Sequence, residues 1–278
     1  MELFEHNRIA YESAAKMLEE RGRAAVIHPT GTGKSFIAFR LCEDHPSSRI
    51  CWLSPSEYIY RTQVDNLVHA GGKAPENIDF YTYAKLMLLS DAELKDICPG
   101  HIVLDEFHRC GAEMWGHGVR RLLELFPKAK VLGLSATNIR YLDNCRDMAD
   151  ELFGGNVASR MTLGEAIALG ILGAPRYVLS AYRLDKDLQK YIRKVRGAKN
   201  KVVREEAEKY YVALRRALEK ADGLDKVFEK NIPDRTGKYI VFCSDYDHLT
   251  EMTEKVPEWF GGIDETPHIY KAYSEDPE

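Results

Sequence analysis

The chain has 278 residues, of which 45% are hydrophobic and 29% are charged, and its formal net charge is −4. Its length and apolar content can fill a core larger than one small domain, so we expect one full domain with additional material. No apolar run reaches the roughly 18 residues of a membrane-spanning helix, and the N-terminus lacks the pattern of a signal peptide. The six cysteines form no Cys-x-x-Cys pair, which argues against a zinc or disulfide framework. We therefore expect a cytoplasmic protein without a membrane partner.

The first predicted elements are an apolar strand near residues 24–28, a glycine-containing turn and a helix. The turn and the helix start read Thr30-Gly31-Thr32-Gly33-Lys34-Ser35. Glycines let the backbone approach an anion closely, and the N–H groups at a helix start favour negative charge. We predict a phosphate loop in which these residues bind ATP, Lys34 contacts its terminal phosphates and Ser35 binds Mg²⁺. His28 stands where the usual pattern begins with glycine, and an ordinary glycine turn is the alternative interpretation.

Further apolar strands are predicted near 50–54, 78–82, 101–105 and 130–135, with helical stretches between them. This alternation predicts an α/β fold with a parallel sheet and helices on both faces. The strand at 101–105 runs directly into two acidic residues. Acids at this end of a strand lie at the ligand edge of a parallel sheet, so we predict that Asp105 binds Mg²⁺ and that Glu106 accepts a proton from the attacking water. Taken alone, such a pair is more often a strand cap, but the upstream loop favours catalysis.

The strand at 130–135 ends in the third motif, Ser135-Ala136-Thr137. Together with residues 31–35 and Asp105-Glu-Phe-His, in this order, it makes the chain resemble the superfamily 2 DExH helicases and translocases, which include type III restriction enzyme translocating subunits. The resemblance covers residues 1–178 and implies a RecA-like P-loop NTPase lobe that uses ATP and Mg²⁺. It further implies that His108, Ser135 and Thr137 couple the nucleotide site to movement on nucleic acid.

The same resemblance implies contacts to a nucleic-acid backbone at Ser54, Pro55, Ser56 and Thr82, because small hydroxyls suit phosphate contacts that position without reading sequence. A strand end with a proline turn is the alternative interpretation of 53–56. Asn7 lies where relatives carry an adenine-recognising glutamine, and its amide offers a matching donor and acceptor. Asn7 is equally suited to cap a helix that begins near Ile9.

Beyond the first lobe, we expect residues 179–235 to form a basic helical linker. Its first part, 183–201, carries many more lysines and arginines than acids, and it either binds phosphates or is a solvated face. Residues 238–244 are predicted to form a strand, which by the resemblance opens a second RecA-like lobe at 236–278. That segment is too short for a whole lobe and shows no match to the arginines of the second lobe. We therefore expect a fragment that is weakly active alone.

The function that this organisation predicts is an ATP-dependent helicase or translocase that moves on DNA or RNA. Of the two, DNA is favoured as the nucleic-acid partner, and a nuclease or methyltransferase subunit is a candidate further partner. Two other hypotheses stay open. One is a nucleotide-gated nucleic-acid-binding subunit of a restriction or mobile-element complex. The other is a P-loop ATPase that does not act on nucleic acid, for which ATP hydrolysis would be indifferent to DNA and RNA.

Overall fold

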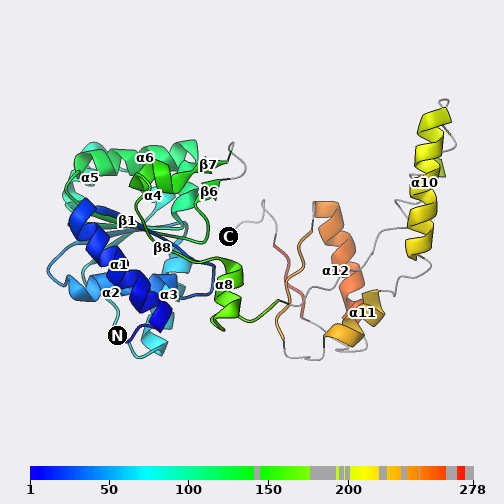
Figure 1. Ribbon diagram of the computed structural model, residues 1–278, viewed down its shortest axis with the longest axis horizontal. Coiled ribbons are helices and arrows are strands. Elements are labelled where there is room, and N and C mark those ends of the chain that lie inside the picture. The colour runs from blue at the N-terminus through cyan, green and yellow to red at the C-terminus, as the bar shows by residue number, and fades with distance from the viewer. Residues whose placement is uncertain are drawn as a thin grey trace. The chain divides into compact units, whose positions relative to one another are not determined.

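The computed structural model describes residues 1–140, 145–175, 192–193, 197, 201–218, 224–232, 237–243, 245–260 and 268–272 (Figure 1). The chain divides into two compact units, Met1–Pro175 and Arg176–Glu278. The finer division into 1–178, 179–235 and 236–278 stays a prediction.

The first unit is built on a six-stranded sheet in the order β3-β2-β4-β5-β1-β8, with every neighbouring pair parallel. The strands are β1 (Arg23–Ile27), β2 (Ile50–Ser54), β3 (Ile78–Thr82), β4 (His101–Asp105), β5 (Lys130–Ser135) and β8 (Val157–Arg160). The predicted α/β fold with a parallel sheet is confirmed, and the five predicted strands are observed to within one residue. Edge strand β8 was missed, because its residues are only partly buried and do not form an apolar run.

Helices cover both faces of this sheet (Figure 1). One face carries α1 (Glu5–Arg21), α2 (Lys34–Asp44) and α3 (Glu57–His69); the other carries α4 (Tyr83–Leu88), α5 (Asp91–Ile97), α6 (Glu113–Leu125) and α7 (Met148–Phe153). The remaining elements are the 3-10 helix η1 (Phe107–Gly111), the two-stranded pair β6 (Ile139–Arg140) and β7 (Arg146–Asp147), and α8 (Leu163–Ala168). Among the described ranges, no helix is both long and apolar enough to cross a membrane.

Strand β1 shows how the sequence builds a core on each face. Successive side chains of a strand point to opposite sides, so Ala24 and Val26 join the cluster under α1 and α2. Ala25 and Ile27 join the cluster under α4 to α7. Since both faces are covered, the central strands read as continuous apolar runs, and every residue of β2 and β4 is buried. The carboxyl ends of these strands then form one edge that presents the polar motifs.

The described part of the second unit contains α10 (Lys201–Leu218), α11 (Leu224–Asn231) and α12 (Tyr246–Phe260). Helices α11 and α12 pack through aromatic rings, with the Phe228 centroid 5.7 Å from Trp259 and 5.3 Å from Phe260. The helical character predicted for this stretch is observed in α10 and α11. Most of the basic segment 183–201 lies outside the described residues, so its phosphate-binding role stays a prediction.

The strand predicted at 238–244 is wrong as far as the structure describes it. Residues 237–243 belong to no strand, and Ser244 lies outside the described residues. Ile240 and Phe242 are 80% and 88% exposed. A strand forms only where a neighbouring strand accepts its backbone hydrogen bonds, and neither of the two described sheets includes this segment. The apolar run alone therefore did not decide its conformation.

Candidate active site

The loop between β1 and α2 has the backbone of a phosphate cradle. Gly31 and Gly33 adopt φ of +89° and +80°, the left-handed region that glycine enters without steric cost. Gly33 is the N-cap of α2. The backbone N–H groups of Gly31, Gly33, Lys34 and Ser35 have no acceptor among the described residues. Unpaired N–H groups at a helix start are the feature that binds phosphate.

Lys34 lies at this helix start with only 8% of its surface exposed. Its Nζ donates a hydrogen bond to the Pro29 carbonyl at 3.2 Å. Burial lowers the pKa of Lys34, while the charges of Glu106 and Asp105 act in the opposite direction. An ordinary glycine turn gives no reason to bury a lysine near two carboxylates, so the geometry favours the phosphate-loop interpretation. The Ser35 hydroxyl makes no hydrogen bond with a described residue.

Two side chains of α1 form hydrogen bonds with the loop. Asn7 is 0% exposed, and its Nδ2 donates to the carbonyls of Thr32 at 3.0 Å and Gly33 at 3.3 Å. The Nε2 of His6 lies 2.8 Å from the Thr32 carbonyl. Helix α1 begins at Glu5 with Phe4 as its N-cap, so the interpretation of Asn7 as a helix cap is wrong. Recognition of adenine by Asn7 stays a prediction, and the observed role of its amide nitrogen is to bind the loop.

Asp105 ends β4 and is 3% exposed. Its Oδ2 accepts hydrogen bonds from Ser54 Oγ at 3.3 Å and from Gln63 Nε2 at 2.9 Å. Burial raises the pKa of Asp105 to about 6, and the Gln63 hydrogen bond and the Lys34 charge oppose that rise. The carboxylate is therefore buried and held by neutral donors. The Tyr83 hydroxyl donates to the Asp105 carbonyl at 2.8 Å and fixes the backbone of the same residue.

The predicted nucleic-acid contacts fall into different settings. Ser54 is 0% exposed and bonded to Asp105, which removes it from that set. Ser56 Oγ caps α3 by accepting from the Ile59 N–H at 3.2 Å, and Thr82 Oγ1 caps α4 by accepting from Lys85 at 3.0 Å. Pro55 is half-buried at the bend between β2 and α3. For Pro55, Ser56 and Thr82 the nucleic-acid role stays a prediction.

Glu106 takes part in a hydrogen-bond network that connects the motif at 105–108 with the motif at 135–137. Its Oε2 lies 3.3 Å from His108 Nδ1 and 3.4 Å from Ser135 Oγ, and the latter two atoms are 2.8 Å apart. The Ser135 hydroxyl also bonds the Thr137 carbonyl at 2.6 Å. Burial alone would raise the pKa of Glu106, but the His108 hydrogen bond and the Lys34 charge outweigh it and lower the pKa. Glu106 is thus a carboxylate at neutral pH.

The structure therefore brings Lys34, Asp105 and Glu106 to one edge and connects Glu106 to His108, Ser135 and Thr137. Sequence reasoning missed Gln63. A signal was present, because residues 59, 60, 63, 64 and 67 of α3 are partly or fully buried at helical spacing, and a glutamine among them is a polar group on the inner face of the helix.

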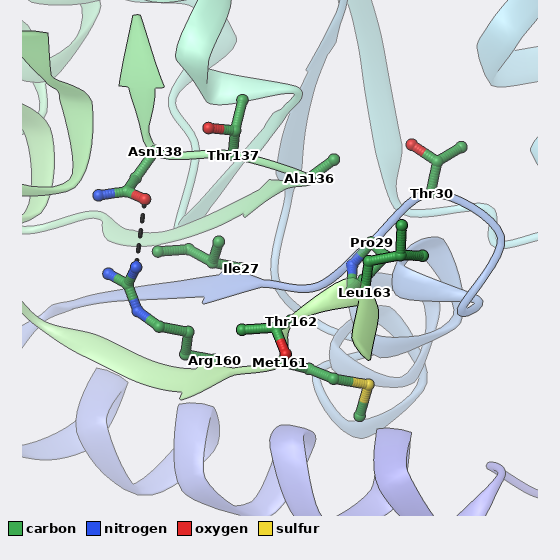
Figure 2. Close-up of a pocket in the computed structure, with 10 residues that line it drawn as sticks. All are labelled: Ile27, Pro29, Thr30, Ala136, Thr137, Asn138, Arg160, Met161, Thr162 and Leu163. Atoms are coloured by element: carbon green, nitrogen blue, oxygen red, sulfur yellow. Dashed lines mark hydrogen bonds between the residues drawn. The ribbon is translucent and has the colours of Figure 1, made fainter. Parts of the chain in front are cut away.

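A pocket of about 460 Å³ opens beside the loop (Figure 2). Its walls come from Ile27, from Pro29 and Thr30, from residues 136–138 and from residues 160–163. It thus lies over the carboxyl ends of β1, β5 and β8.

The first half of the chain matches a known protein family. The profile of the family described as "Type III restriction enzyme, res subunit" matches residues 1–140, half of the chain. The chain belongs to this family. Among curated proteins, none is significantly similar in sequence to this res-subunit domain.

Two solved structures are similar to this res-subunit domain. The ATP-dependent type ISP restriction-modification enzyme LlaBIII bound to DNA is similar with a TM-score of 0.52 and 16% identity, covering 94% of this chain and 22% of that chain. The Hef helicase domain of Pyrococcus furiosus is similar with a TM-score of 0.47 and 14% identity, covering 68% of this chain and 45% of that chain. The res-subunit domain therefore spans less than half of either protein.

Proposed function

We propose that this res-subunit domain binds ATP with Mg²⁺ at the loop and hydrolyses it to drive movement on nucleic acid, as a helicase or translocase. The observation that carries the proposal is the meeting of a buried lysine, Lys34, with Asp105 and Glu106 at the carboxyl edge of a parallel sheet. This is the edge at which open α/β sheets bind their ligands.

The loop fits a nucleotide triphosphate on its own chemistry. Four backbone N–H groups of the loop and helix start have no acceptor among the described residues, and the Lys34 side chain adds a positive charge. Ser35 and Asp105 would hold Mg²⁺, which prefers oxygen ligands and takes one or two carboxylates with phosphates and water. Within the described ranges no group of three or more His, Cys, Asp or Glu is arranged for a metal. A magnesium ion here would therefore depend on the nucleotide as well as the protein.

The roles of the side chains follow from their charge states. Lys34 places a positive charge against the terminal phosphates, and Mg²⁺ when bound neutralises charge on the β- and γ-oxygens. Glu106 is ionised and accepts a proton from the attacking water. Because Glu106 bonds both His108 and Ser135, a change in its charge or partner is felt at Ser135 and Thr137. These residues are proposed to relay the nucleotide state to the nucleic-acid site.

DNA is the proposed track, with a nuclease or methyltransferase as partner. The family description names a restriction enzyme subunit, and LlaBIII is titled as a restriction-modification enzyme bound to DNA.

The test is steady-state ATP hydrolysis by the chain alone and with single-stranded DNA, double-stranded DNA and RNA. Glu106→Gln serves as the hydrolysis-deficient variant, and Lys16→Ala, an exposed change on α1, serves as the control. We expect a weak hydrolysis that DNA stimulates and that Glu106→Gln abolishes. Hydrolysis that no nucleic acid alters would overturn the motor function and leave a P-loop ATPase of another purpose. DNA binding that ATP modulates without hydrolysis would indicate a nucleotide-gated binding subunit.

A further inference from the structure

The two left-handed glycines of the phosphate loop each lie against a side chain from a distant segment. A Cβ added at Gly33 would lie 2.9 Å from Asn7 Nδ2, and a Cβ added at Gly31 would lie 3.2 Å from Leu172 Cδ2. Asn7 also donates hydrogen bonds to the loop, whereas half-buried Leu172 contacts it by packing. The loop is therefore fixed from two sides, by α1 and by the chain that follows α8.

The sequence at the end of α8 explains how Leu172 reaches the loop. Gly170 follows the helix with a φ of +69°, and its N–H donates to the Ile167 carbonyl at 3.0 Å. The N–H of Ile171 donates to the Ala166 carbonyl at 2.9 Å. These two bonds form a Schellman motif, which ends a helix at a left-handed residue and turns the chain. The turn directs Leu172, whose N–H also donates to the Ala166 carbonyl at 3.1 Å, toward the loop.

The chain that leads into α8 contacts the base of the same loop. The N–H of Met161 donates to the Ile27 carbonyl at 2.9 Å, and Ser159 Oγ lies 2.8 Å from His28 Nε2. The start of α8 and the first residues of the loop line one pocket (Figure 2). One continuous segment, from β8 to Leu172, thus contacts the loop first at its base and then at its centre.

The contact at Gly31 matters because a glycine has more backbone freedom than any other residue. A loop that is already in its bound conformation binds more tightly, since less conformational entropy is lost on binding. Apart from its chain neighbours, Leu172 is the only described residue within 4 Å of a Cβ added at Gly31. Leu172 also lies three residues before Pro175, where the first unit ends. It is therefore in contact with the loop and close in sequence to the boundary between the units.

We propose that Leu172 is a positioning residue of the phosphate loop, which keeps Gly31 in the conformation that binds nucleotide phosphates and couples nucleotide binding to residues 171–175. These residues lead into the second unit, so the contact gives the nucleotide state a route to the unit boundary. The inference rests on the proposed nucleotide site. Coupling between two sites is reciprocal, so bound nucleotide stabilises the segment as much as the segment favours binding.

The first part of the test measures the affinity of the chain for a β,γ-imido analogue of ATP with Mg²⁺ by isothermal titration. Leu172→Ala should weaken binding at least about fivefold, the lower end of ordinary coupling between sites. Leu172→Met keeps an apolar side chain of similar volume and should retain most of the affinity. Leu169→Ala is the matched control, because Leu169 lies in the same turn but is 67% exposed. Circular dichroism and thermal unfolding confirm that each variant is folded.

The second part needs no variant and measures amide hydrogen exchange in the wild type with and without the analogue. The amides of Ile171 and Leu172 should exchange more slowly when nucleotide is bound. The amide of Gly72 is the comparison, because it donates to the Leu67 carbonyl in a turn of the same kind, with Gly71 at a φ of +82°, at the end of α3. Its exchange should not change, and the slowing at residues 171 and 172 should be absent in Leu172→Ala.

Unchanged or tighter binding by Leu172→Ala overturns the inference, as does nucleotide protection that is absent at residues 171 and 172 or equally large at Gly72. The nucleotide site is judged separately with Lys34→Ala. If the wild type does not bind the analogue, or Lys34→Ala binds it equally well, the proposed site is wrong and the inference falls with it. If Lys34→Ala weakens binding and Leu172→Ala does not, only the role of Leu172 fails.

Discussion

The Nε2 of Gln63 donates a hydrogen bond to Asp105 Oδ2 across 2.9 Å, joining the middle of α3 to the end of β4. Asp105 is buried, so its orientation depends on such donors, and Ser54 is the other one. A side chain that orients a metal-binding carboxylate affects metal affinity although it touches no metal. Gln63 is therefore a positioning residue for the proposed magnesium site.

Replacing Gln63 with alanine should raise the Mg²⁺ concentration that gives half-maximal ATP hydrolysis by about 10- to 100-fold, the range seen when such outer partners are removed. The rate at saturating Mg²⁺ should change less, because Glu106 keeps its own partners. Thr62→Ala is the control, since the Thr62 hydroxyl bonds only within α3. An unchanged Mg²⁺ dependence in Gln63→Ala would show that this amide merely packs.

Gly33→Ala should both destabilise the fold and remove ATP binding. A Cβ at this position would lie 2.9 Å from Asn7 Nδ2, and the φ of +80° is strained for any residue with a Cβ. Gly71→Ala is a matched control, because Gly71 has a φ of +82° and nothing within 4 Å of an added Cβ. Left-handed strain costs about 1–2 kcal/mol of stability in each variant. Gly33→Ala should lose more stability than Gly71→Ala, because its Cβ also meets Asn7.

Urea unfolding with and without ATP and Mg²⁺ measures both effects of these glycine variants. ATP should raise the free energy of unfolding of Gly71→Ala as it does for the wild type, and should leave that of Gly33→Ala unchanged. Stabilisation of both variants by ATP to the same degree would contradict the idea that Asn7 and Gly33 must fit closely.

Asn7 and Asn77 offer a second matched pair. Each is an asparagine whose Nδ2 donates to several backbone carbonyls: Asn7 to Thr32 and Gly33, and Asn77 to Cys42, His45 and Ser48. Leaving buried carbonyls without donors costs about 1–3 kcal/mol, so both alanine variants should be less stable. Only Asn7→Ala should also weaken ATP binding, because only Asn7 binds the phosphate loop. Isothermal titration of the folded variants decides; equal affinities would confine Asn7 to a purely structural role.

The elements that could be predicted from the sequence are those whose information is local. Strands β1 to β5 are apolar runs next to turns, and the loop around Lys34 is a compact motif. β8 is a half-exposed edge strand whose partner β1 lies more than a hundred residues earlier, so nothing local distinguishes it. The strand prediction at 238–244 is wrong for the opposite reason: the composition suits a strand, but residues 238–243 belong to neither of the described sheets.

The residues of the candidate site likewise fall into those that local sequence predicts and those that it does not. Lys34, Asp105 and Glu106 follow from motifs at the ends of strands. The partners of these residues do not, because Gln63 reaches Asp105 from another helix and Asn7 reaches the loop from α1. Ser54 shows the limit of motif transfer: the expected hydroxyl is present, but the fold buries it against a carboxylate. Contacts between distant segments thus decide which polar residues face a ligand.

The buried imidazole of His28 should make folding sensitive to mild acid. His28 is 1% exposed, its Nε2 lies 2.8 Å from Ser159 Oγ, and its Nδ1 has no partner among the described residues. Burial, with smaller effects from His6 and Lys34, lowers the pKa of His28 to about 4. In the unfolded chain the ring regains its ordinary pKa near 6.5.

Between pH 6.5 and pH 4 the unfolded state therefore binds the extra proton, so the free energy of unfolding falls as the pH falls through this window. Replacing His28 with asparagine should remove about 2 kcal/mol of that fall, since each pKa unit corresponds to about 1.4 kcal/mol and the environment is partly screened. His101, whose pKa is also lowered to about 4 by burial, accounts for part of the dependence that remains. Urea unfolding at pH 7 and pH 4.5 measures the difference, with His69→Asn on the exposed end of α3 as the control. If wild type, His28→Asn and His69→Asn lose the same stability between the two pH values, His28 is not held neutral by the fold.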